Sequence, residues 1–218
     1  MLTLWQVVEH YIPNGWKVTY DITANQDPDH KQNYYSTFYT NRKDYQLPDG
    51  VTAYTGVADE NTNVLNLTPI EDNIIPAGKG VILRLTQEDN TEKTAHFILE
   101  ESSESGTWSG TNILSGFDTE TTLGATDYAL TLGKNGVGFY NWNGRALGAH
   151  KAYLTLPGSQ PAPLRSFGFR FDDGTTTGIP ATIFDQPQDD AIYNLQGQRV
   201  DESYKGLIIK NGQKVYNY

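Results

Sequence analysis

Residues 127–142 read DYALTLGKNGVGFYNW, and this stretch decides the fold. Two runs of alternating apolar and polar residues flank Asn135-Gly136. That dipeptide favours the two-residue turn of a β-hairpin, because both turn residues need the positive φ that asparagine and glycine tolerate best. Counting outward from the turn predicts that Leu132 pairs with Phe139.

The predicted hairpin has two faces of different character, because successive side chains of a strand point to opposite sides of the sheet. The face expected to join the core carries Leu130, Leu132, Val137 and Phe139. The opposite face carries Thr131, Tyr140 and Trp142. Two large aromatic side chains are therefore expected on the outer surface, about 7 Å apart along the strand.

The same pattern extends on both sides of the hairpin. Short segments rich in β-branched and aromatic residues alternate with Gly, Pro, Asn and Asp, which is typical of strands and turns. The nine predicted strands are residues 34–40, 51–57, 63–68, 80–85, 95–100, 127–132, 136–142, 151–156 and 165–171. They predict an all-β domain, an antiparallel β-sandwich of jelly-roll or Greek-key type.

The flanking segments predict the domain boundaries. Residues 1–33 are expected to be a lead-in segment, either a short helix or the tail of an upstream domain, and its polar part, 22–33, is predicted to be a loop. The sandwich is expected over 34–173. Residues 174–190, rich in Pro, Gly and Thr, predict a linker.

The tail, residues 191–218, is expected to form a small separate β-sheet. Its Asn211-Gly212 dipeptide predicts a second hairpin. Counting outward from that turn pairs Ile208 with Val215.

Composition excludes several classes of function. The 218 residues include 16 basic and 26 acidic side chains, a formal net charge of −10, and no cysteine. An acidic chain is a poor partner for nucleic acid or anionic lipid, which attract a basic face. Disulfides and cysteine-ligated zinc cannot form. No run approaches the roughly 20 apolar residues of a membrane-spanning helix, so membrane insertion is not expected.

The sequence predicts no metal, cofactor or catalytic centre. The histidines lack metal-ligand spacing, and neither a nucleophile elbow nor a phosphate loop is present. Glu100-Glu101 and Asp172-Asp173 are predicted to be solvated residues at strand ends and turns. A pair of carboxylates about 5 to 9.5 Å apart in one cleft would instead favour glycan hydrolysis.

The predicted outer face leaves two interpretations open. Sugars stack their apolar faces on flat aromatic rings, whose polar edges can also form hydrogen bonds. Tyr140 and Trp142, with Thr131 beside them, are therefore candidate glycan-binding residues. Alternatively, another strand, the loop that carries Trp108 or the C-terminal sheet covers the two rings, since large aromatic side chains are buried on average.

Four strings resemble a known family. They are STFYTNRKDYQLPDGVTAYTGV (36–57), IIPAGKGVILRL (74–85), NGVGFYNWNGRALGAHKAYLTLP (135–157) and RSFGFRFDDGTTTGI (165–179). These sequences resemble a β-domain found near the C-termini of secreted and surface proteins of Bacteroides and Prevotella. The resemblance covers about residues 35 to 178 and consists of strands and turns rather than catalytic residues.

The tail resembles a second kind of segment. IYNLQGQRV (192–200) and KGLIIKNGQKV (205–215) are similar to the C-terminal sorting-type segment of Bacteroidota surface proteins, which is related to type IX secretion. The tail is expected to be such a segment or a small terminal β-cap. The chain opens MLTLWQVVEHYIPNGW, without the pattern of a secretory signal, so we expect the signal and other domains of an exported protein upstream.

These resemblances imply a non-catalytic accessory or interaction module of an exported bacterial protein. It would be located outside the cell or at the cell surface, with a glycan or a protein as its partner. The first alternative is a carbohydrate-binding module that uses Tyr140, Trp142 and Thr131. The second is a glycan hydrolase that uses an Asp/Glu pair.

Overall fold

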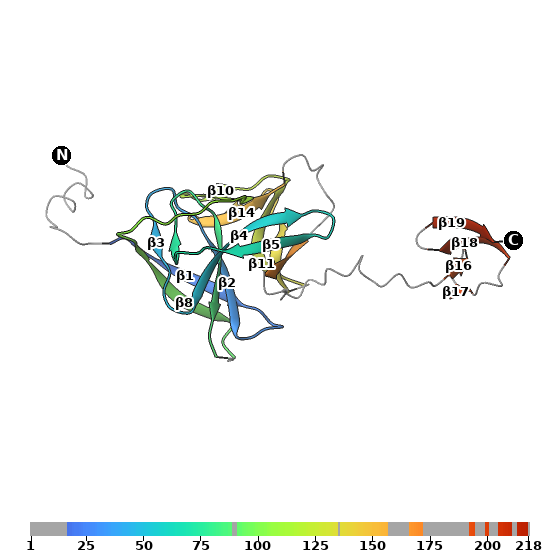
Figure 1. Ribbon diagram of the computed structural model, residues 1–218, viewed down its shortest axis with the longest axis horizontal. Coiled ribbons are helices and arrows are strands. Elements are labelled where there is room, and N and C mark those ends of the chain that lie inside the picture. The colour runs from blue at the N-terminus through green and yellow to red at the C-terminus, as the bar shows by residue number, and fades with distance from the viewer. Residues whose placement is uncertain are drawn as a thin grey trace. The chain divides into compact units, whose positions relative to one another are not determined.

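The structure is a computed structural model, and it describes residues 17–88, 91–134, 136–156, 166–171 and 205, together with the backbone of four strands in the tail. The chain divides into two compact units, Met1–Ile179 and Pro180–Tyr218, which are considered separately below. Every regular element among the described residues is a strand, and none is a helix (Figure 1). The all-β prediction is therefore confirmed for the described part of the chain.

The described residues of the first unit form fifteen strands. They are β1 (Thr19–Gln26), β2 (Asn33–Phe38), β3 (Tyr45–Gln46), β4 (Val51–Asp59), β5 (Val64–Pro69), β6 (Ile74–Ile75), β7 (Val81–Thr86), β8 (Thr94–Glu101), β9 (Leu114–Phe117), β10 (Thr121–Thr122), β11 (Asp127–Gly133), β12 (Gly136–Asn141), β13 (Ala146–Leu147), β14 (Lys151–Thr155) and β15 (Ser166–Phe171). All nine predicted strands are present, with ends that differ by a residue or two.

The predicted loop over residues 22–33 is wrong for its first part, because β1 occupies Thr19–Gln26. Strand β1 pairs antiparallel with β8 and β2, and Figure 1 shows the three side by side. Ile22, Ala24 and Gln26 are buried while the residues between them are exposed. Only two of these inward residues are apolar, so the sequence does not show a clear alternation of apolar and polar residues. Within the described residues the main sheet thus begins at residue 19, and the helix considered for the lead-in lies outside them.

Thirteen of the strands form one mixed sheet rather than a purely antiparallel one. Its order is β6-β3-β8-β1-β2-β7-β4-β5-β15-β12-β11-β14-β9, while β10 and β13 form a separate two-stranded sheet. The prediction of antiparallel pairing is wrong at one place, where β15 runs parallel to β5 with Gly168 opposite Val64 and Phe171 opposite Leu67. A parallel neighbour needs a long connection, and here nearly 100 residues separate the two strands along the chain, so local turn signals could not reveal the pair.

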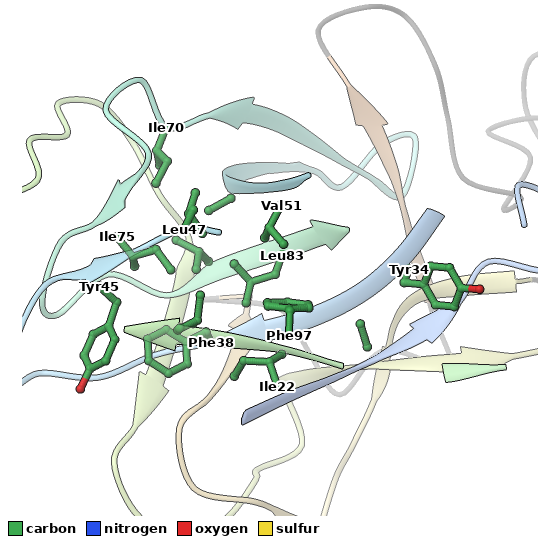
Figure 2. Packing of buried hydrophobic residues seen from close by; sticks show 14 of the residues in the cluster. Ile22, Tyr34, Phe38, Tyr45, Leu47, Val51, Ile70, Ile75, Leu83 and Phe97 are labelled. Carbon is green, nitrogen blue, oxygen red and sulfur yellow. The ribbon is translucent and has the colours of Figure 1, made fainter. Parts of the chain in front are cut away.

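The central strands β2, β7 and β4 are covered on both faces, so that consecutive residues within each of them are buried. On β7, Val81 and Leu83 belong to one hydrophobic cluster and Ile82 to another. The first cluster consists of Ile22, Ala24, Tyr34, Phe38, Tyr45, Leu47, Val51, Ala53, Ile70, Ile75, Val81, Leu83, Ala95, Phe97 and Leu99 (Figure 2). The second consists of Tyr35, Tyr54, Leu65, Leu67, Ile82, Leu114, Tyr128, Val137, Phe139, Leu154, Leu156, Phe167, Phe169 and Phe171.

The sheet curls until β14 returns to the end of β2. The Tyr39 N–H donates to the His150 carbonyl at 3.1 Å, and the Ala152 N–H donates to Thr37 Oγ1 at 3.2 Å. Strands β2, β7, β4, β5, β15, β12, β11 and β14 therefore follow one another around the second cluster. The sides of β11, β12 and β14 that point away from this cluster form an outer surface.

The hairpin of residues 127–142 forms, but its register differs by two residues from the prediction. Leu132 pairs with Val137, and Gly133 pairs with Gly136. An even shift keeps every side chain on its predicted face, so the alternation of the sequence does not distinguish the two registers. Val137 and Phe139 are buried as predicted. Leu132 is 50% exposed, because it lies near the tip of the hairpin.

The strands described in the second unit form a four-stranded sheet in the order β17-β16-β18-β19. Its strands are β16 (Ile192–Asn194), β17 (Arg199–Val200), β18 (Gly206–Lys210) and β19 (Gln213–Asn217). Ile208 pairs with Val215, so the register predicted for this hairpin is confirmed. The predicted linker, residues 174–190, lies outside the described residues.

Candidate functional site: an outer aromatic face

The candidate site lies on the outer surface of β12, β11, β14 and β9. One row of paired residues crosses these four strands, because Tyr140 pairs with Ala129, Ala129 with Tyr153, and Tyr153 with Ser115. Paired residues share a face, so the two tyrosines stand on the same side with only an alanine between them. Two strand spacings separate them by about 10 Å.

A stacked pair of rings extends this surface toward the edge of the sheet. Phe117 on β9 lies parallel to Tyr153 on β14, with ring centroids 5.4 Å apart and an interplanar angle of 7°. Phe117 is 41% exposed. We call Phe117, Tyr140, Trp142 and Tyr153 the aromatic face.

The environment of Tyr153 includes an acidic neighbour. Burial, followed by the Asp127 carboxylate, raises the pKa of the Tyr153 phenol, while a hydrogen bond with Thr155 acts in the opposite direction. Asp127 itself accepts a hydrogen bond from the Thr155 hydroxyl at 2.7 Å. The Tyr153 hydroxyl therefore stays protonated, and can donate a hydrogen bond, throughout the neutral range.

Tyr140 is held against the hairpin by a glycine. Its ring lies so close to Gly133 that an added Cβ there would come within 2.3 Å of the tyrosine Cζ. The Tyr140 hydroxyl donates to the carbonyl of Gly136 at 2.9 Å. The ring is half-buried and fixed in place before any ligand arrives.

Trp142 follows β12 and continues its ladder by one residue, since its N–H donates to the Asp127 carbonyl at 2.9 Å. The indole N–H donates to the Ala146 carbonyl at 3.0 Å. The Arg145 guanidinium lies 3.9 Å from the centroid of the indole ring, in a cation–π contact. Arg145 thus covers one face of Trp142 and leaves the indole half-buried.

Sequence reasoning found part of this surface. Thr131, which pairs with Gly138, is half-buried on the same side as Tyr140 and contributes a hydroxyl group. Phe117 and Tyr153 were missed as site residues, because their strands become neighbours of the hairpin only through the tertiary fold. One signal in the sequence could have placed Tyr153 on the outer side. It lies between Ala152 and Leu154 in a predicted strand, and both of these residues face inward.

Ionisable groups elsewhere form isolated pairs. His30, His96 and His150 each lie 3.2 to 3.4 Å from one aspartate, namely Asp27, Asp21 and Asp118. Within the ranges that the structure describes, no three His, Cys, Asp or Glu side chains are grouped so that they could hold a metal ion. Glu101 lies 3.7 Å from Lys43 Nζ, whereas Asp172-Asp173 lie outside the described residues.

In comparisons with known proteins, no family model, curated protein or solved structure matches the chain. None of the described segments is a helix of the length and apolar character needed to cross a membrane.

Proposed function

We propose that this protein is a non-catalytic accessory module of an exported bacterial surface protein, and that it binds a glycan through the aromatic face. The accessory role and the location outside the cell rest on the resemblance to domains of Bacteroides and Prevotella proteins. In this proposal the curled sheet is a sandwich of Greek-key or jelly-roll type. The tail would serve for sorting or as a terminal cap.

The observation that carries glycan binding is the row of aromatic side chains across β12, β11, β14 and β9. Rings two strands apart, on a surface with hydroxyl groups from Thr131 and Ser115, can stack on successive parts of one sugar chain and hydrogen-bond to its hydroxyls. The net charge of −10 disfavours an anionic polysaccharide. A neutral glycan therefore fits this surface best.

Affinity gel electrophoresis tests the proposal. The whole chain is run through gels that contain neutral polysaccharides such as xyloglucan, arabinoxylan or starch, and its retardation is compared with that of the Tyr140→Ala/Tyr153→Ala double variant. We expect the double variant to bind at least about tenfold more weakly, which corresponds to about 1.4 kcal/mol. Ile98→Ala is the matched control, since Ile98 is an exposed apolar residue on β8, which is not a strand of this surface.

Two results would contradict glycan binding. One is that no neutral polysaccharide retards the protein, and the other is that retardation is the same in the double variant and the parent chain. In either case the accessory role in an exported protein would remain as a separate prediction.

A further inference from the structure

A pocket lies between the end of β5 and the long connection from β8 to β9. Its volume is about 240 Å³, and it is lined by Thr68, Pro69, Glu71, Thr107, Trp108 and Ser109. We call residues 102–113 the Trp108 loop. A volume below the roughly 300 to 1,000 Å³ of pockets for drug-sized ligands suits a single ring.

The Trp108 loop is fixed at its beginning by a carboxylate from a distant part of the chain. Asp44 accepts hydrogen bonds from the Gly106 N–H at 2.9 Å and from the Ala77 N–H at 2.8 Å, one on each oxygen. Its carbonyl also accepts from the Ser102 N–H at 2.8 Å. Asp44 thereby joins the Trp108 loop to the turn that precedes β7.

The loop is fixed at its other end by an amide side chain. Asn112 donates to the Gly80 carbonyl at 2.9 Å and accepts from the Gly56 N–H at 3.1 Å. Part-buried hydrogen bonds of this kind, two of them charge-assisted, hold a loop in one conformation before a ligand binds, which reduces the ordering cost of binding. The pocket is therefore pre-formed.

Trp108 presents an aromatic surface in the part of the loop between the contacts of Asp44 and Asn112. It packs in part against the first cluster, and it lies close to Gly110, whose φ of 140° is a conformation that glycine tolerates best. The Lys79 ammonium group lies 5.5 Å from the centroid of the indole ring. The ring is half-buried, with its position set by the core on one side.

The polar groups of the pocket match the hydroxyl groups of a sugar. Thr68, Glu71 and Ser109 are exposed, and they offer two hydroxyls and a carboxylate around the indole. Thr107 donates to Asp72 at 2.6 Å, which places a second carboxylate at the rim. One aromatic ring surrounded by hydrogen-bonding groups binds a pyranose by stacking and by hydroxyl contacts. The two carboxylates outnumber the single Lys79 ammonium group, so the local charge disfavours a sugar acid.

We propose that the Trp108 pocket is a second binding site, which accepts one neutral sugar unit such as the end or a side branch of a glycan. This site shares no residue with the aromatic face. It would therefore bind short or monomeric sugars that are too small to span the aromatic row.

Two-dimensional ¹H–¹⁵N NMR of the whole chain tests the proposal, with the neutral methyl glycosides of glucose, galactose and mannose and with glucuronic acid as the probes. We expect at least one methyl glycoside to shift the indole signal of Trp108 in a saturable manner, and to bind at least about tenfold more tightly than glucuronic acid, a difference of about 1.4 kcal/mol. Trp108→Ala should abolish the saturable shifts of neighbouring amides such as that of Ser109. Trp142→Ala, which removes the tryptophan of the aromatic face, should leave them unchanged.

A second variant keeps the test decisive if Trp108→Ala weakens the fold. Glu71→Ala changes an exposed side chain, so the protein stays folded, and we expect methyl glycoside binding to weaken by about tenfold because a hydrogen bond to a charged group is lost. Shifts confined to the Trp142 indole would overturn the pocket proposal while supporting the aromatic face. Absence of saturable shifts with every methyl glycoside, or tighter binding of glucuronic acid, would also overturn it.

Discussion

The phenol ring of Tyr140 lies against Gly133 on the neighbouring strand, where a Cβ would come within 2.3 Å of the tyrosine Cζ. Glycine inside a strand contributes no packing of its own, and an aromatic ring on the adjacent strand can cover it. This contact ties a residue of the candidate site to the stability of the hairpin, so that one substitution should affect both.

Gly133→Ala is expected to push the Tyr140 ring outward and to break its hydrogen bond to the Gly136 carbonyl. We expect unfolding free energy to fall by about 1 kcal/mol, the usual net value of one hydrogen bond. Urea denaturation measures this change. Gly148→Ala serves as the control, because nothing lies within 4 Å of the added Cβ there. An equal effect of the two substitutions would contradict the contact.

Phe139→Ala and Phe117→Ala should differ sharply in how much they lower stability, although both remove a phenylalanine from this half of the sheet. Phe139 is fully buried in the second cluster, so its truncation is expected to cost about 3 to 5 kcal/mol. Phe117 is 41% exposed, and its loss should cost about 1 kcal/mol or less while weakening glycan binding. Denaturant midpoints together with gel retardation separate the two effects. A large loss of stability from Phe117→Ala would mean that this side chain is a core residue.

Asp44→Ala should loosen the Trp108 loop. Two backbone N–H groups, those of Ala77 and Gly106, lose their carboxylate acceptor, and we expect a cost of about 2 kcal/mol. Hydrogen exchange of these two amides should speed up relative to the parent chain. Asp49→Ala, at an exposed turn position, should leave both stability and exchange unchanged. Slow exchange in Asp44→Ala would show that other contacts hold the loop.

Stability should fall as the pH rises above about 10, and Tyr35 should account for part of the fall. Burial, followed by the Asp27 carboxylate, raises the pKa of Tyr35 above its ordinary value of about 10. The folded state then keeps a proton that the unfolded chain has lost, so the contribution to stability is complete below pH 10 and declines above it. Tyr45 contributes in the same direction, because burial raises its pKa as well.

Tyr35→Phe is expected to flatten the alkaline decline, because a phenylalanine has no proton to lose. Urea denaturation of the parent chain and the variant, at pH 7 and at several values above 10, checks this expectation. Identical slopes for the two proteins above pH 10 would show that Tyr35 ionises equally in the folded and unfolded states.

Sequence patterns predicted the strands well wherever each strand carried its own signal. The nine segments from residue 34 to residue 171 are rich in β-branched and aromatic residues and are bounded by turn residues, and all of them form strands. Strand β1 has a weaker signal, because Ile22 and Ala24 are its only buried apolar residues. Its mostly polar sequence therefore predicted a loop. The hairpin register was missed because registers that differ by two residues place the same side chains inward.

The candidate site depended on tertiary pairing, which local patterns do not encode. Thr131, Tyr140 and Trp142 could be placed on one face because a single tight turn connects their strands. Tyr153 joined them only after β14 paired with β11, and Phe117 only after β9 paired with β14. The Trp108 pocket was beyond prediction for the same reason, since Asp44 fixes a loop that begins more than 50 residues further along the chain.

The parallel pairing of β15 with β5 has a consequence for synthesis of the chain on the ribosome. Strand β15 fills the gap between β5 and β12, and it supplies Phe167, Phe169 and Phe171 to the second cluster. Until residue 171 has left the exit tunnel, two strand edges stay open beside an unfilled apolar interior. A nascent or truncated chain that stops before Ser166 should consequently be prone to aggregate and to recruit chaperones, because exposed edges and apolar surface promote association.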